Sequence, residues 1–150
     1  MVGKTTNDGL SAQERAAVKQ RAQELKLQAK REKEAGKAAA EKADQLAKIA
    51  EMPDGDRQTA ERLSEIVADA APALAPRLYY GQPGWAKDGK VVVFFRSGQM
   101  DKDRYSTLGF SSRAALDDEH GLWPTAFALQ DPTEKAWNAV TALIRRAAEA

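Results

Sequence analysis

The aromatic residues of this 150-residue chain are confined to its C-terminal part, and this distribution most constrains how the chain can fold. Every Trp, Tyr and Phe follows Leu78, and residues 1–52 contain none. A segment with no aromatics and few large aliphatic side chains cannot offset the entropy lost on ordering a compact core. We therefore expect a charged helical arm at residues 1–52 and a folded domain at residues 53–150.

The expected arm has the signals of a helix. Ser11 and Glu14 occupy the N-cap and N3 positions of a capping box, and good helix formers follow. Gly36 is expected to interrupt this helix before a second helical stretch at residues 37–52, where Leu46 and Ile49 are candidates for docking on the domain. Pro53-Asp54-Gly55-Asp56 is a turn and marks the expected boundary.

Two amphipathic helices enclose the expected domain. Leu63 and Val67 follow helical spacing within residues 57–71, and Val140 and Ile144 do so in a last helix that opens after Asp131. Between them, apolar runs at residues 77–80, 85–87, 90–96, 104–110 and 125–129 predict about five short strands. A tight corner is expected at residues 81–84 and a short helix at residues 111–116.

The strand at residues 90–96 gives the sharpest local prediction. Asp88-Gly89 precedes it and favours a two-residue hairpin, because both turn residues need a positive φ. Strict alternation would place Val91, Val93 and Phe95 on one face and Val92 and Phe94 on the other. Most connections are too short for helical crossovers. The predicted fold is therefore α+β, an antiparallel sheet of about five strands flanked by N- and C-terminal helices that lie on one face.

Several function classes are excluded or disfavoured by the sequence. The chain has no Cys, which excludes disulfides and thiolate metal sites. It has no run of 18 apolar residues and no apolar segment typical of a signal peptide, so we expect a cytoplasmic protein without a membrane partner. Phosphate-loop, dinucleotide-binding and nucleophile-elbow motifs are missing, and we expect no enzymatic activity.

Part of the chain resembles a known family. The run Tyr80-Gly81-Gln82-Pro83, Trp85 and the segment Asp88 to Phe95 resemble the YdhG-like family of small bacterial proteins, with the likeness extending over residues 57–148. The resemblance implies a frataxin-like fold, and some members are described as intracellular iron chaperones. Gln82 departs from the family pattern, which often has Trp-Gly-Met-Pro at this corner.

Acidic residues on the first domain helix are the candidate metal ligands. Glu61, Glu65 and Asp69 recur every four residues and share one helix face, and Asp54 and Asp56 precede them. Carboxylate oxygens suit iron and other hard cations. With the resemblance, they imply weak iron binding and an iron-acceptor protein as partner. The plainer interpretation is the solvated face of an amphipathic helix.

Three further groups of residues are candidates for a function. Tyr80, Gln82 and Trp85 are candidates for lining a small ligand pocket beside the corner, although aromatic side chains more often pack in a core. Asp117 to His120 combines carboxylates with the single His, but a solvated loop explains it equally well. The Lys- and Arg-bearing helix at residues 12–35 has interleaved glutamates that cancel much of its field.

Two functional hypotheses follow from these features. The first is an iron-binding chaperone that uses weak surface carboxylate ligands. The alternative is a non-catalytic interaction module whose helical arm binds protein, ribosome or nucleic acid.

Overall fold

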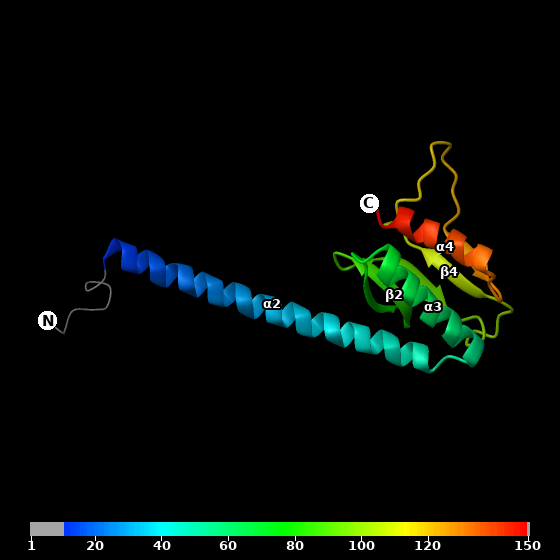
Figure 1. Ribbon diagram of the computed structural model, residues 1–150, viewed down its shortest axis with the longest axis horizontal. Coiled ribbons are helices and arrows are strands. Elements are labelled where there is room, and N and C mark those ends of the chain that lie inside the picture. Colours follow the sequence, from blue (N-terminus) through cyan, green and yellow to red (C-terminus); the bar gives the residue numbers. More distant parts are fainter. Residues whose placement is uncertain (1–10, 150) are drawn as a thin grey trace. The chain divides into compact units, whose positions relative to one another are not determined.

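The computed structural model describes residues 11–149, whose helices and strands are drawn in Figure 1. The chain divides into two compact units, Met1–Lys37 and Ala38–Ala150. Helix α2 (Ala12–Ala50) begins at the predicted cap, where the Glu14 amide donates a 3.0 Å hydrogen bond to the Ser11 hydroxyl oxygen. The interruption predicted at Gly36 is wrong, because one Gly costs only about 1 kcal/mol in a helix otherwise built from strong helix formers.

The second unit begins well before the predicted boundary at Pro53. Ile49 and Met52 belong to its hydrophobic core, whereas Leu46 is 52% exposed. Gln45 lies one turn before Ile49 and is buried, and its side-chain amide donates a 2.7 Å hydrogen bond to the Gly84 carbonyl. The last part of α2 is therefore part of the folded unit.

The fold is α+β, as predicted. After helix α3 (Asp54–Ala70) come five strands in the antiparallel order β1-β2-β3-β4-β5, and helix α4 (Glu134–Ala147) closes the unit. The strands are β1 (Ala75–Tyr79), β2 (Gln82–Lys87), β3 (Lys90–Arg96), β4 (Ser106–Phe110) and β5 (Ala126–Leu129). A Thr133 cap, whose hydroxyl accepts from the Ala136 amide, begins α4.

Two tight hairpins join the first three strands. Asp88 and Gly89 have φ of 51° and 79°, which agrees with the predicted turn. Tyr80 and Gly81 form a second such turn, with φ of 49° and 77°. The corner predicted at residues 81–84 is thus wrong, because β2 already begins at Gln82.

The short helix predicted at residues 111–116 does not form. Ser111 instead donates from its hydroxyl to the Val91 carbonyl and accepts from the Arg113 amide. These bonds hold the segment after β4 against β3 as a turn, so the hydroxyl expected to cap a helix is used elsewhere.

One face of the sheet carries the core. The pairs Trp85↔Val93, Val93↔Phe110 and Phe95↔Leu108 place these five side chains on the same face, and all are buried. They join one hydrophobic cluster with the buried side chains of the helices, which are Ile49, Leu63, Val67, Trp137, Val140, Ile144 and Ala147. The helices of the second unit therefore pack on this face, as predicted.

A β-bulge changes which side chains of β3 enter the core. The register shifts between Trp85 and Ala86, which pair with Val93 and Val91, so that Val92 has no partner on β2. Val92 joins the core beside Val93, whereas Val91 lies against Gly84 on the opposite face. The predicted grouping of Val91 with Val93 is wrong. The extra residue shifts the alternation of side chains between the two sheet faces by one position, so Val91 points to the face opposite Val93.

The contribution of α2 to the core predicts different outcomes for two shortened chains. A chain that begins at Ala38 should keep the stability of the full chain in chemical denaturation. A chain that begins at Met52 loses Ile49 and the Gln45 hydrogen bond, and should be destabilised by at least about 2 kcal/mol. Equal stability of the two shortened chains would contradict this assignment and would restore the boundary at Pro53.

Candidate functional site

The sheet face opposite the core is the candidate binding surface. Its side chains follow from the register, because Tyr79 pairs with Gln82, Gly84 with Arg77 and Phe94, and Arg96 with Thr107. The five strands contain four Lys or Arg residues and no Asp or Glu. One of these four, Lys87, donates to the carbonyl of Ala148 at the end of α4. Arg77 and Arg96 lie on the face away from the helices, which therefore carries aromatic side chains with a positive bias.

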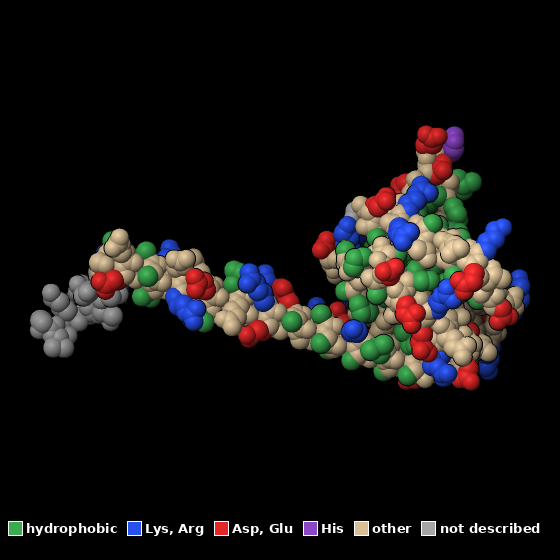
Figure 2. Space-filling model, in the orientation of Figure 1, with side chains coloured by type: hydrophobic (Ala, Val, Ile, Leu, Met, Phe, Trp, Pro, Cys, Tyr) green, Lys and Arg blue, Asp and Glu red, His purple; other side chains and the backbone are tan. Residues whose placement is uncertain are grey.

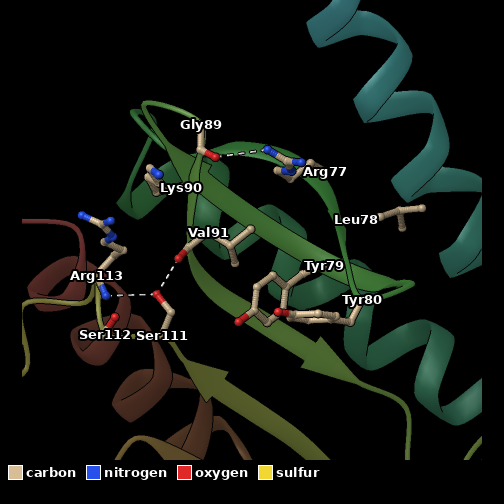
Figure 3. A pocket seen from close by; sticks show the side chains of 10 residues that line it. All are labelled: Arg77, Leu78, Tyr79, Tyr80, Gly89, Lys90, Val91, Ser111, Ser112 and Arg113. Carbon is tan, nitrogen blue, oxygen red and sulfur yellow. Dashed lines mark hydrogen bonds between the residues drawn. The ribbon is translucent and has the colours of Figure 1, made fainter.

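A first hollow of about 380 Å³ extends from Tyr79 and Tyr80 toward the turn at Gly89, and residues of β1, β3 and the segment after β4 line it (Figure 3). Three cationic side chains line it, Arg77, Lys90 and Arg113, together with Tyr79 and Tyr80. No carboxylate side chain and no helical residue is among the described residues that line it. Such a hollow suits a ligand that combines negative charge with an apolar, flat part.

Arg77 is held in place at the edge of this hollow. One of its terminal nitrogens donates a 3.2 Å hydrogen bond to the Gly89 carbonyl, which the dashed line in Figure 3 marks. Its Nε is buried and has no hydrogen-bond partner within the described part of the chain. A buried donor without a partner costs about 1–3 kcal/mol.

A second hollow, of about 240 Å³, shares both tyrosines with the first. Tyr79, Tyr80, Gln82, Phe94 and Arg96 line it. The rings of Tyr79 and Phe94 are 5.0 Å apart, and the rings of Tyr79 and Tyr80 are 4.6 Å apart and nearly perpendicular. The Gln82 Oε1 atom is buried and lacks a hydrogen-bond partner among residues 11–149. Each hollow thus combines aromatic walls with a cationic side chain, and in the second hollow that cation, Arg96, is paired with Asp101.

Tyr80 occupies an unfavourable backbone conformation. Its φ of 49° lies in the left-handed region, and its side chain is 91% exposed. Left-handed conformation costs an ordinary L-residue about 1–2 kcal/mol, which Gly avoids and Asn tolerates better. A large exposed ring kept at this position gives up stability without filling the core, which is typical of residues retained for binding.

Phe94 depends on the absence of a side chain at Gly109. A Cβ atom placed on Gly109 would collide with the Phe94 Cζ atom, so the ring occupies the space directly above β4. Phe94 is consequently half-buried on the open face rather than projecting into solvent.

The five candidate metal ligands do not converge. Asp56 accepts hydrogen bonds from the Ser97 hydroxyl and from the Gln99 amide, and so stabilises the loop after β3. Arg57 lies between Asp54 and Glu61, at 3.0 and 3.3 Å from their carboxylate oxygens. Glu65 and Asp69 are exposed on α3. Within residues 11–149 no group of three His, Cys, Asp or Glu side chains is arranged to hold a metal ion.

Arg62, which lies among these acids, is paired with α4. Two of its nitrogens each donate a 2.9 Å hydrogen bond to the Glu134 carboxylate. These hydrogen bonds hold the pKa of Glu134 below its ordinary value. The helix side consequently shows acidic and basic side chains interspersed (Figure 2) rather than a field of one sign.

The loop with the single His is exposed. His120 lies beside acidic side chains in Figure 2, and its Nε2 atom is 3.6 Å from the Glu119 carboxylate. The Asp118 carboxylate accepts from the His120 amide and so forms part of the turn. This geometry is that of a solvated loop.

The predicted ligand-pocket residues are divided between the two sheet faces. Tyr80 and Gln82 line the hollows, but Trp85 is only 2% exposed and packs in the helix-side core. The prediction that Trp85 lines the pocket is therefore wrong. Trp85 lies two positions after Pro83 on β2, so both side chains point to the core face. The sequence interpretation missed Arg77, Lys90 and Arg113, whose proximity depends on two hairpins and a loop.

Comparisons with known proteins leave the family assignment as a prediction. No family model, no curated protein and no solved structure matches the chain. Among the described residues, no helix is long and apolar enough to cross a membrane.

Proposed function

We propose that the chain is a non-catalytic binding module, and that the open face of its sheet binds phosphorylated ligands that carry a flat ring. The single observation that carries the proposal is Tyr80, an exposed aromatic residue in a strained turn that borders both hollows. A cytoplasmic location, expected from the sequence, is part of the same proposal.

The lining of the first hollow supports this class of ligand. Arg77, Lys90 and Arg113 can neutralise a phosphate and donate hydrogen bonds to it. Tyr79 and Tyr80 offer ring surfaces at the same place, and stacking on an aromatic side chain is worth about 1–3 kcal/mol per base. Among the described residues that line the hollow, no nucleophile is paired with a base, and binding without chemistry is the function that this lining supports best.

Uridine monophosphate is a suitable probe, with uridine and inorganic phosphate as its separate parts. In equilibrium dialysis the intact nucleotide should bind, and each part alone should bind more weakly. Tyr80→Asn removes the ring, and should weaken nucleotide binding about tenfold, as expected for one lost stacking contact. Because Asn tolerates a positive φ, the same change should leave the melting temperature unchanged or higher.

Asp88→Asn is the matched control, since it places the same residue in the second turn of the same kind. Because it also removes a negative charge beside Gly89 and Lys90 of the first hollow, it should leave nucleotide binding unchanged or slightly tighter, and not weaker. A Tyr80→Asn variant that binds the nucleotide as well as the original chain would contradict the proposal. If the original chain does not bind the nucleotide, the proposal is contradicted as well.

Iron binding by the α3 carboxylates is the second candidate function. It is supported by the exposure of Glu61, Glu65 and Asp69 on successive turns of α3 and by the YdhG-like resemblance. Asp54, Asp56 and Glu61 each already have a partner, so an ion would compete with Arg57 or with the loop after β3 for their carboxylates. Open, weak coordination would suit an ion that must be passed to an acceptor protein.

Anaerobic calorimetric titration with ferrous iron tests this second candidate. Replacing Glu61, Glu65 and Asp69 by Gln, Gln and Asn should weaken binding at least about tenfold, or about 1.4 kcal/mol. Unfolding free energy should change by less than about 0.5 kcal/mol per site, because the side chains are exposed. The control replaces Asp117, Asp118 and Glu119 in the same way. If the control variant loses iron and the α3 variant keeps it, the α3 assignment fails.

A further inference from the structure

We propose that the natural ligand of the open face is a single-stranded nucleic acid, of which successive nucleotides occupy the two hollows. This inference rests on the proposed function and specifies its ligand class. It depends on an observation that a mononucleotide site does not need, namely a second hollow that shares a wall with the first.

The two hollows repeat the same chemistry on either side of Tyr79 and Tyr80. The first has Arg77, Lys90 and Arg113, and the second has Arg96. A ligand that spans both must therefore present negative charge and a flat ring more than once. Single-stranded nucleic acid has this repeat, and a positively charged groove with aromatic stacking positions is the usual way of binding it.

The polar side chains that line the hollows differ in a way that fits this ligand. Arg77 and Lys90 in the first hollow carry only donors and suit phosphate oxygens. Gln82 in the second carries an amide with both a donor and an acceptor, which suits a base edge. Arg96 is oriented by a 2.6 Å hydrogen bond from its Nε to Asp101, and its side chain is 61% exposed.

The surface beyond Phe94 leaves room for a strand to continue. Thr107 and Gly109 on β4 pair with Ala128 and Ala126 on β5, so the open face carries only small side chains there. Ala126 and Ala128 are exposed. Phe94 borders this shallow floor, and its ring lies over Gly109. Together these residues extend the binding face beyond the second hollow.

The absence of acidic residues from all five strands favours a polyanion over a peptide of mixed charge. An acidic peptide would satisfy the cations, but it would not supply the successive flat rings that the tyrosines and Phe94 can stack against. The arm is a poorer candidate for the same ligand, because Glu14, Glu24, Glu32 and Glu34 interrupt its basic residues.

A length series of oligouridylates, measured with the full chain at low salt, tests the inference. UMP, UpU, a tetramer and an octamer should be titrated, each with a 5′-phosphate so that every step adds whole nucleotides, with the deoxythymidine octamer to separate RNA from DNA. The step from UMP to UpU should raise affinity at least about tenfold, the gain expected from one further stacked base. With about three phosphates neutralised, octamer affinity should fall about fifteenfold between about 50 and about 200 mM salt.

Three double variants locate the binding surface. Lys90→Gln with Arg113→Gln removes two cations from the first hollow, and should reduce octamer affinity at least about fivefold and lower the salt dependence. Lys135→Gln with Arg145→Gln removes the same charge from exposed positions on α4 and should have little effect. Lys26→Gln with Arg31→Gln does so on the arm and should also have little effect.

The outcomes separate the inference from the proposed function. If UMP binds but UpU and the octamer bind no more tightly than UMP, the nucleic-acid inference fails and the nucleotide-binding function stands. If none of the probes binds, both fail. If the arm variant loses octamer binding while the Lys90 and Arg113 variant keeps it, the assignment to the open face is overturned.

Discussion

The fold depends on the packing of Trp85 against Val93 beside a single extra residue in β3. Trp85 is almost completely buried in the core, and the bulge at this point adds Val92 to the same core. Val91 then turns to the opposite face, where Gly84 and Tyr79 lie close to it. One irregularity in one hairpin thus sets both the composition of the core and the composition of the open face.

Burial on only one side of the sheet leaves the other side free to bind. The helices of the second unit join the strands in one hydrophobic cluster, so their apolar surfaces are used on that face. The opposite face carries Tyr79, Phe94 and Arg96 at positions where an ordinary one-sided sheet would carry short polar residues. Tyr80 extends this surface at a cost in backbone energy. Stability and binding are therefore assigned to different faces of the same five strands.

Much of this architecture could be predicted from the sequence. The apolar run at residues 90–96 and the Asp88-Gly89 pair gave a central strand and its hairpin, because they are local signals of backbone conformation. The bounds of α2 were harder to predict from the sequence. Gly36 is a weak helix breaker, and the burial of Gln45 depends on a hydrogen bond to a carbonyl 39 residues away. The bulge was invisible in the sequence, since every residue from Val91 to Phe95 is apolar and fits either face.

The candidate site could be predicted only in part, for the same reason. Tyr80 and Gln82 were identified beside a turn, but Trp85 was placed with them because the core face of β2 was not known. Arg77, Lys90 and Arg113 come from a strand, a hairpin and a loop, and only tertiary structure brings them to one hollow. For the α3 carboxylates the helical spacing was predicted correctly, but Arg57 pairs with two of the five and the loop after β3 binds a third.

The central claim is that the open face of the sheet is the functional surface, and chemical-shift mapping by NMR with UpU tests it most directly. The account predicts that amide and aromatic shifts change at Tyr79, Tyr80, Gln82 and Phe94, with smaller changes at Ala126 and Ala128. Amides of α3 and α4 should not change. Shifts that concentrate on α3 or on residues 11–37, with the open face unaffected, would contradict the account.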